Sequence, residues 1–284
     1  MIVVEQVGPL ATIQDLGRPG WFDSGVGPAG AADRASFRLA NRLVGNPEAY
    51  AGIEVLLGGL VLRADRHRTV AVTGAPAPAT VDGTPVGHAT VLELAAGRTL
   101  RLGLAGAGLR SYVAVRGGID VPPTLGSRSR DTLSGIGPRP LRSGDRLPIG
   151  PAPHTLPSVE FAPMAEMNTD TLTIRAVLGP RDDWFVDAGA LFGGEWTVST
   201  DTDRVGARLD RHAGPPLRRS VTHELPTEGM ALGSIQVPPS GQPVVFLADH
   251  PISGGYPVVA VVVDADIDAV AQARPGQALR IHRA

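Results

Sequence analysis

An Asp-His pair stands at the end of an apolar segment in the C-terminal half of the sequence. Residues 243–248 read PVVFLA and run directly into Asp249 and His250, where the polarity changes. The β-branched residues of this segment predict a buried strand. A carboxylate beside an imidazole at the exit of a rigid strand could orient a reacting group or act as a general base. The alternative is a strand-end turn in which Asp249 accepts hydrogen bonds from nearby backbone amides.

Three further polar residues in this half have side chains suited to binding a ligand. Gln236 follows a turn of small residues and could recognise an amide, or it could be a solvated strand position. Tyr256 lies in a Gly-Gly-Tyr-Pro corner and could donate a hydrogen bond to a carbonyl group, or it could be a core tyrosine. Arg204 could bind a ligand or form a salt bridge between strands. We predict Asp249, His250 and Tyr256 as catalytic residues, and Gln236 and Arg204 as substrate-binding residues.

The N-terminal half contains a second set of candidate ligands. Arg128 stands between Ser127 and Ser129 in a loop that begins with a glycine. Its paired N–H donors suit a carboxylate or a phosphate, and the alternative is a surface arginine that holds backbone carbonyl groups. Gln14 and Asp15 precede a tight Gly-Arg-Pro-Gly turn, where an aspartate is more often structural. We predict Arg128, Ser127 and Gln14 as further substrate-binding residues.

The composition excludes several kinds of chemistry. The chain has no cysteine and no lysine, so all 26 basic residues are arginines. This excludes a cysteine nucleophile, a Schiff-base lysine, a P-loop lysine and covalently attached biotin. The seven histidines show no metal-ligand spacing, and we therefore predict no metal. Local motifs such as a Gly-x-Ser-x-Gly elbow or a dinucleotide fingerprint are also absent from the sequence.

The overall charge and hydropathy narrow the choice of partners and compartment. The formal net charge is −2, which argues against nucleic acid or an anionic membrane as a partner. The sequence has neither a run of 18 apolar residues nor a basic-then-apolar start, so we expect no membrane span and no signal peptide. With no cysteine to form disulfides, we expect the cytoplasm.

The elements that must position these residues are expected to be mainly β. The chain contains 36 glycines and 26 prolines, which punctuate short β-branched segments. Two short helices are expected, over 33–44 with Asp33 as N-cap and over 264–273. The pattern Gly-x-x-Leu-x-Leu/Ile recurs at 97–102, 144–149 and 276–281, and the last two copies are each expected to close a barrel-like half. We expect two β units, 1–155 and 168–284, with a proline-rich linker at 156–167.

Blocks spread over nearly the whole chain resemble one protein family. They occur in the family's order, and together they are specific. The blocks are 12–20 (TIQDLGRPG), 25–41 (GVGPAGAADRASFRLAN), 43–47 (LVGNP), 112–122 (YVAVRGGIDVP), 125–129 (LGSRS), 179–185 (GPRDDWF), 203–209 (DRVGARL) and 234–257. The chain resembles the biotin-dependent carboxyltransferase family that includes allophanate hydrolase subunit 2 and the C subunit of bacterial 5-oxoprolinase, and that is related to an antagonist of a sporulation-kinase inhibitor.

The resemblance implies a fold of tandem cyclophilin-like β-barrels and a role as one part of a multi-subunit enzyme. It implies an amide (lactam) hydrolase that opens 5-oxoproline to glutamate with ATP, in a hetero-oligomer with a B-type and an A-type subunit. The chain is expected to be inactive alone, and ATP is expected as the cosubstrate of the complex. Where the family often has Asp-Arg-Gln-Thr-Thr-Gly-Gly-Tyr-Pro, this chain has DHPISGGYP at 249–257.

Two other functions are compatible with the same resemblance. The first is a regulatory binding protein that antagonises a kinase inhibitor and performs no chemistry. The second is a carboxyltransferase component that uses carboxybiotin on a separate carrier, since this chain has no lysine to which biotin could be attached.

Overall fold

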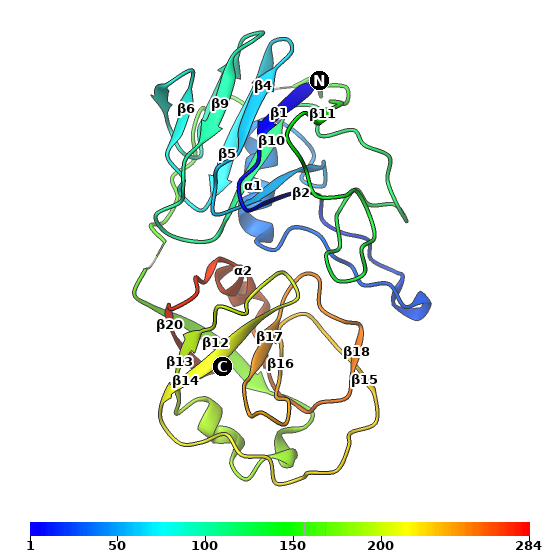
Figure 1. Ribbon diagram of the computed structural model, residues 1–284, viewed down its shortest axis with the longest axis vertical. Coiled ribbons are helices and arrows are strands. Elements are labelled where there is room, and N and C mark those ends of the chain that lie inside the picture. The colour runs from blue at the N-terminus through cyan, green and yellow to red at the C-terminus, as the bar shows by residue number, and fades with distance from the viewer. Residues whose placement is uncertain (156, 168) are drawn as a thin grey trace. The chain divides into compact units, whose positions relative to one another are not determined.

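The computed structural model describes residues 1–155, 157–167 and 169–284. The chain forms two compact units. The first comprises Met1–Arg18 and Ala29–Met167, and the second comprises Pro19–Pro28 and Asn168–Ala284. Strands dominate both units, and helices are few and short (Figure 1). The predicted mainly-β fold with a few short helices is therefore confirmed.

The first unit contains two antiparallel sheets. The strand order in the larger one is β11 (Arg146–Leu147), β1 (Ile2–Gln6), β4 (Val61–Ala64), β9 (Thr99–Leu102), β6 (Ala79–Val81) and β7 (Thr84–Val86). The order in the smaller one is β2 (Leu10–Gln14), β3 (Gly52–Leu56), β10 (Arg110–Val115), β5 (Arg68–Gly74) and β8 (Val91–Leu94). Buried side chains from both sheets form one apolar core, which includes Ile2, Leu62, Ile53 and Val113.

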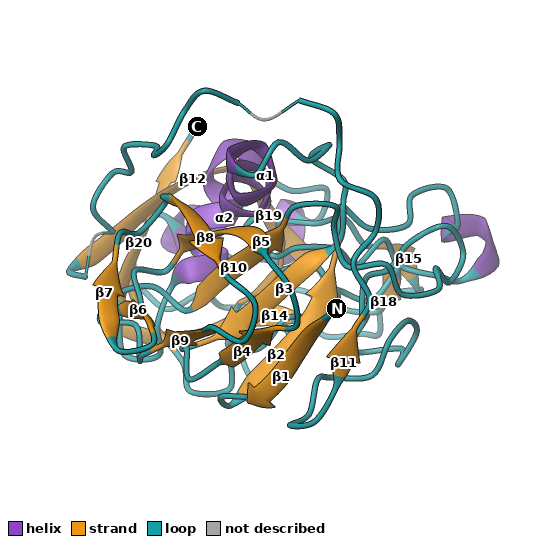
Figure 2. Cartoon of the chain, turned by 90° about the horizontal axis from the view of Figure 1, so that it is seen from above, coloured by secondary structure: helices purple, strands orange, loops and turns teal. Residues whose placement is uncertain are grey.

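Helix α1 (Arg34–Leu43) covers two of the three inner strands of the smaller sheet. It contacts β10 and β5 (Figure 2), and its buried Phe37 and Ala40 belong to a second apolar cluster. As predicted, Asp33 caps the helix, since its side chain accepts a hydrogen bond from Ser36 N at 2.9 Å. Because this face is covered by the helix, all residues of β10 and β5 are buried, whereas strands such as β9 alternate between buried and exposed residues.

The second unit is built on a closed barrel of seven strands. The barrel order is β12 (Thr171–Leu178), β19 (Val258–Val262), β16 (Ser234–Gln236), β17 (Val244–Phe246), β14 (Gly206–Ala213), β13 (Glu195–Val198) and β20 (Ala278–Arg283). β20 closes the barrel because it pairs with β13 on one side and runs parallel to β12 on the other. This is the closing strand expected from the third copy of the Gly-x-x-Leu pattern. Outside the barrel lie β15 (Glu228–Gly229), β18 (Ser253–Gly254), α2 (Asp264–Gln272) and the 3-10 turns η1 (Phe22–Ser24), η2 (Asp182–Trp184) and η3 (Ala188–Leu191).

Two segments outside the sheets make contacts that local sequence patterns do not predict. Residues Pro19–Pro28 group with the second unit, although the residues on both sides of them in the sequence belong to the first. The base of this excursion is tied within the first unit, where Ala31 N donates to Asp15 O at 2.9 Å. The expected linker also has fixed contacts, since Val91 N donates to Glu160 O and Ala162 N donates to Ala89 O. The backbone at 160–162 therefore covers the edge of β8.

Helix length bears directly on membrane insertion. α1 spans 10 residues and α2 spans 9. Within the ranges that the structure describes, no helix combines the length and the apolar character that crossing a bilayer requires.

Candidate functional site

A buried carboxylate organises the loop that carries Arg128. Asp15, at the end of β2, accepts four hydrogen bonds. Its Oδ1 accepts from Ser127 Oγ at 2.6 Å, from Ser129 Oγ at 2.5 Å and from Gly17 N at 2.8 Å. Its Oδ2 accepts from Arg128 N at 2.6 Å. Both serines are fully buried, so the loop at 127–129 is wrapped around the carboxylate and the Arg128 backbone is fixed. The expectation that Asp15 is structural is confirmed.

The side chain of Arg128 leaves this buried loop and reaches the surface. Its Nε donates to Val121 O at 2.7 Å, and its Nη2 donates to Asp120 Oδ1 at 2.8 Å. The side chains of Arg128 and Asp120 retain 34% and 52% of their accessible surface. Neither Nη1 of Arg128 nor Oδ2 of Asp120 has a hydrogen-bond partner among the described residues. The pair is thus held in place while one donor and one acceptor stay available.

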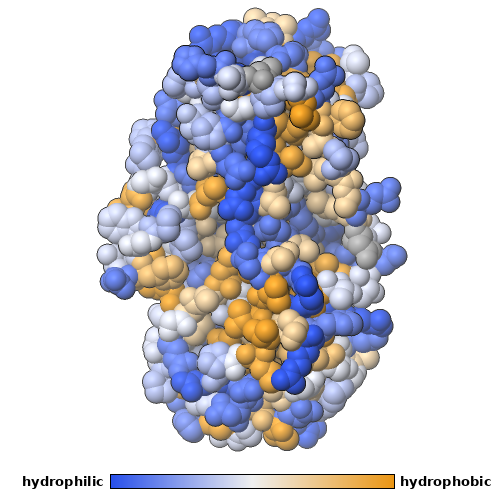
Figure 3. All heavy atoms as spheres, turned by 180° about the vertical axis from the view of Figure 1, so that it is seen from behind, coloured by the Kyte–Doolittle hydropathy of each residue, from blue (hydrophilic) through white to orange (hydrophobic). Residues whose placement is uncertain are grey.

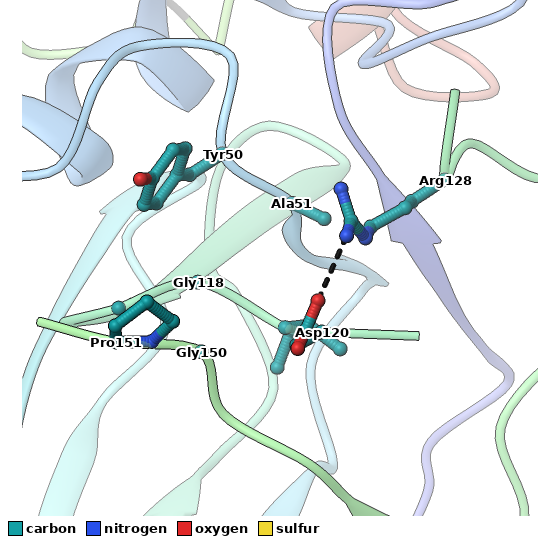
Figure 4. Close-up of a pocket in the computed structure, with 9 residues that line it drawn as sticks. Tyr50, Ala51, Gly118, Asp120, Arg128, Gly150 and Pro151 are labelled. Carbon is teal, nitrogen blue, oxygen red and sulfur yellow. Dashed lines mark hydrogen bonds and ion pairs between the residues drawn. The ribbon is translucent and has the colours of Figure 1, made fainter. Parts of the chain in front are cut away.

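A cavity of about 250 Å³ lies beside this ion pair. Figure 4 shows Arg128 and Asp120 on one side of it, with Tyr50 and Pro151 on the other. The lining residues are Tyr50, Ala51, Gly117, Gly118, Ile119, Asp120, Arg128, Gly150 and Pro151.

Glycines allow the walls of this cavity to come together. Gly118 has φ +69°, and a Cβ there would lie 3.0 Å from a ring atom of Tyr50. Gly117 has φ +96°, and its Cβ would lie 2.4 Å from the carbonyl oxygen of Gly150. Larger residues would therefore be strained at both positions and would push the segments apart. The shape of the cavity depends on the Gly-Gly pair that precedes Ile119 and Asp120.

The Asp-His pair of the second unit lies in a different environment. Both oxygens of Asp249 accept hydrogen bonds from Arg204, with Nε–Oδ2 and Nη2–Oδ1 distances of 2.9 Å each. Asp249 is 2% exposed and Arg204 is 3% exposed. The backbones are joined as well, since Asp249 N donates to Arg204 O at 2.9 Å. This is the salt bridge that was the alternative to ligand binding for Arg204, and a bidentate geometry of this kind fixes two loops against each other.

His250 follows in the same buried turn. Its Nδ1 lies 2.8 Å from Pro251 O. Because a carbonyl oxygen only accepts, this distance assigns the proton to Nδ1. The imidazole stacks on Phe246, with ring centroids 6.1 Å apart and planes inclined by 23°. Only 3% of His250 is exposed, so both members of the predicted pair are buried, with Asp249 held by Arg204 and His250 stacked on Phe246 of β17.

Gln236 and Tyr256 are linked through the Gly-Gly-Tyr-Pro corner. The Nε2 of Gln236 donates to Tyr256 O at 3.1 Å, and a Cβ on Gly254 would lie only 2.7 Å from the same nitrogen. Gln236 is buried, whereas Tyr256 is 45% exposed. Gln236 is therefore not the solvated strand position that was its alternative, and Tyr256 is not a core tyrosine.

The structure divides the predicted site residues between the two units. Gln14, Ser127 and Arg128 belong to the first unit. The other five, Gln236, Arg204, Asp249, His250 and Tyr256, belong to the second. Gln14 is fully buried and donates to Thr12 Oγ1 and to Arg130 O at 3.0 Å each. Among the eight, the side chains of Arg128 and Tyr256 are accessible, and the catalytic and substrate-binding roles stay predictions.

The sequence reasoning missed Asp120 and Tyr50. Asp120 ends the Gly-Gly-Ile-Asp sequence of one family-like block, and Tyr50 lies two residues before Gly52. That position was the available signal, because polar residues after paired glycines often line a site where the backbone approaches a ligand.

A metal centre would need several ligands close together. In the parts of the chain that are described, no three His, Asp or Glu side chains come close enough to hold a metal ion. The donor set beside the cavity is one guanidinium and one carboxylate, which suits a hydrogen-bonding organic ligand better than a cation.

The fold and these sequence blocks agree with one family. The family model for the carboxyltransferase domain, subdomains A and B, matches residues 24–283. The chain belongs to this family.

Named relatives specify the similarity further. The chain is 38% identical to the C subunit of 5-oxoprolinase from Escherichia coli, over 98% of this chain and 89% of that protein. It is 36% identical to the C subunit of 5-oxoprolinase from Haemophilus influenzae, over 99% of this chain and 90% of that protein. Urea amidolyase of Saccharomyces cerevisiae is 34% identical over 96% of this chain, which corresponds to 16% of that enzyme. The chain is thus homologous to the 5-oxoprolinase C subunits and to one region of urea amidolyase.

Solved structures show the same fold over almost the full chain. The protein TTHA0988 matches with a TM-score of 0.88 and 35% identity over 99% of this chain. The urea amidolyase of Kluyveromyces lactis matches with a TM-score of 0.90 and 30% identity over 99% of this chain. This chain spans 55% of TTHA0988 and 18% of the K. lactis enzyme. Both relatives therefore contain further polypeptide beyond the matched region.

Proposed function

We propose that the chain is the C subunit of an ATP-dependent 5-oxoprolinase, which opens 5-oxoproline to L-glutamate together with a B-type and an A-type subunit. The observation that carries the proposal is the 38% identity to the C subunit of the E. coli 5-oxoprolinase over nearly the full length of both proteins. A cytoplasmic location is part of the proposal, because the chain has no cysteine for disulfides and the reaction consumes ATP.

The chemistry explains why ATP and several subunits would be needed. A lactam is stabilised by resonance, so its hydrolysis needs activation. Transfer of the γ-phosphoryl group to the lactam oxygen releases ADP. Water then adds to the activated carbon and the C–N bond opens, which leaves an acyl phosphate on the former ring carbon. A second water hydrolyses this acyl phosphate to the carboxylate of glutamate and releases phosphate. In this chain, Arg128 has a donor set suited to a carboxylate or phosphate oxygen. We expect the chain to be inactive alone, because the relatives that it matches over nearly their full length are named as one subunit of 5-oxoprolinase.

The partners would need a surface on this chain. The second unit exposes the large apolar side chains of Val177, Val186 and Tyr256. Figure 3 shows apolar side chains gathered on one face of that unit and bordered by hydrophilic ones. Exposed apolar surface of this kind is typical of protein contacts and supports a hetero-oligomer with the B-type subunit.

Reconstitution tests the proposal. The chain, the B-type subunit and the A-type subunit are purified separately and mixed, and glutamate release from 5-oxoproline is measured with and without ATP. We expect ATP-dependent release from the complete set and none from this chain alone. Robust release by the chain alone, or none by the complete set, would contradict the proposal.

A carboxyltransferase is the second candidate, and the family model and the urea amidolyase relatives favour it. In this reaction a carboxyl group would pass from carboxybiotin on a separate carrier to an amide such as urea. The chain itself has no lysine for biotin. The test is to mix a carrier that holds labelled carboxybiotin with urea and this chain. If the carrier loses its labelled carboxyl groups only when both are present, this candidate is favoured over the first.

A further inference from the structure

We infer that the cavity beside Arg128 recognises an amide edge, with Arg128 donating to an oxygen of the ligand and Asp120 accepting from its N–H. The naming of 5-oxoproline as this ligand rests on the proposed function. The recognition of an oxygen acceptor beside an N–H donor rests on the geometry of the first unit alone.

The donor is a guanidinium that is already oriented. The protein uses Nε of Arg128 for Val121 O and Nη2 for Asp120 Oδ1. Nη1 is left for a ligand, since no described residue accepts from it. The backbone beneath is fixed by the Asp15 carboxylate. A side chain held by two bonds and a fixed loop loses little conformational entropy when a ligand binds.

The acceptor distinguishes this cavity from a simple anion site. Asp120 neutralises Arg128, so the pair offers no net positive charge to a bare anion. Its Oδ2 has no partner in the described ranges and can accept from an N–H group. A ligand that satisfies both groups must carry an oxygen acceptor and an N–H donor close together. 5-Oxoproline does so through its carboxylate or lactam oxygen and its ring N–H, and urea does so through its carbonyl and amino groups.

The size and walls of the cavity suit a small, flat molecule. Its volume is about 250 Å³, and Tyr50 lies on the side of it opposite the ion pair (Figure 4). Gly118 lies against Tyr50, and a Cβ there would be 3.0 Å from that ring. A five-membered lactam can therefore lie against the Tyr50 ring and the glycine backbone while its polar edge meets Arg128 and Asp120.

Ligand analogues test the inference without any change in the protein. Calorimetry measures binding of 5-oxoproline, N-methyl-5-oxoproline and urea to the chain alone and to the complete complex. N-methylation replaces the N–H donor by a methyl group, so we expect affinity to fall about tenfold or more, at least the loss associated with one hydrogen bond to a charged group. Equal affinity for both lactams, or no binding of 5-oxoproline and urea in either preparation, would overturn the inference.

Variants locate the binding site. Asp120→Ala should weaken 5-oxoproline about tenfold and leave the weaker N-methyl compound unchanged, whereas Arg128→Met should weaken both. Arg66→Met is the matched control, because Arg66 is an exposed arginine of the same unit. Circular dichroism checks that each variant is folded. Equal losses for both ligands in Asp120→Ala would contradict the assigned contact.

The outcome also separates this inference from the proposed function. Binding of urea but not of 5-oxoproline would support amide recognition and contradict the 5-oxoprolinase assignment. The complete complex could instead release glutamate while Asp120→Ala and Arg128→Met each leave the KM for 5-oxoproline unchanged. That result would support the proposed function and overturn the site.

Discussion

At the residue scale, the loop that presents Arg128 depends on one carboxylate. Asp15 accepts from two buried hydroxyls and two backbone amides. Asp15→Ala leaves these donors unsatisfied, and we expect a loss of roughly 3 kcal/mol in the free energy of unfolding. Chemical denaturation measures the loss, with Asp23→Ala as an exposed control expected to stay within about 0.5 kcal/mol of wild type. A wild-type midpoint for Asp15→Ala would show that the network contributes little.

His88 should make stability sensitive to mild acid. Burial lowers the pKa of His88 below 6.5. Its Nε2 lies 3.1 Å from Gly74 O and so carries a proton, while Nδ1 is buried with no partner in the described part of the chain. A second proton is therefore bound more readily in the unfolded state. The contribution of His88 is complete above pH 6.5 and is lost as the pH falls below it.

This pH dependence can be measured by comparing unfolding at pH 7.5 and pH 5. Wild type should lose more stability between these values than His88→Gln, because a glutamine amide can donate to Gly74 O and does not titrate in this range. The same loss in both proteins would assign the acid sensitivity to other groups.

Because Asp249 forms a buried ion pair with Arg204, we expect Asp249→Asn mainly to lower the free energy of unfolding. Removing one charge of a buried pair leaves the other uncompensated, and we expect a loss of about 3 kcal/mol. The double variant Arg204→Met/Asp249→Leu should lose less stability than the sum of the losses in Arg204→Met and in Asp249→Leu. A double-mutant cycle measures this difference. A turnover loss of roughly 100-fold at wild-type stability would instead support the predicted role of Asp249 as a base.

At the element scale, β20 is the strand on which closure of the second barrel depends. Ile281 is 1% exposed, whereas the adjacent His282 points to the other face and is exposed. Ile281→Ala should cost about 3 kcal/mol because it leaves a cavity in the core, and His282→Ala should cost less than about 0.5 kcal/mol. Thermal and chemical unfolding of the two variants provide the comparison, and equal effects would contradict the assigned strand face.

Elements with a strong local signal were predictable from the sequence. Helix α1 follows from the Asp33 cap and the apolar period that includes Phe37 and Ala40. Helix α2, Asp264–Gln272, lies within the expected range 264–273. The contacts of Pro19–Pro28 were not predictable, because a segment rich in glycine and proline has no period and its grouping depends on residues far away in the sequence.

The candidate site was predictable to a similar extent. Arg128 stood out by its residue type and its glycine-led loop. Asp120 and Tyr50 did not, because Tyr50 meets Gly118 only through the folded sheets. The burial of an arginine could not be predicted from its neighbours in the sequence. No local pattern therefore distinguished the buried Arg204 from the accessible Arg128.

At the scale of the whole molecule, the central expectation is a stable complex with the B-type subunit. Exposed apolar side chains on the second unit would be covered by such a partner. Size-exclusion chromatography with light scattering on the co-expressed pair should show co-elution at micromolar concentration, at a mass of at least one copy of each chain. Separate elution of the two proteins would contradict this expectation.

The excursion at Pro19–Pro28 has a consequence for the order in which the protein is made. Residues 19–28 emerge from the ribosome long before Asn168–Ala284, the remainder of the unit to which they belong. The bond from Ala31 N to Asp15 O ties the base of the excursion within the first unit. The first unit can therefore fold during synthesis with these ten residues held out as a closed loop. The second unit therefore contains one segment that is synthesised before the first unit is complete and one that follows it.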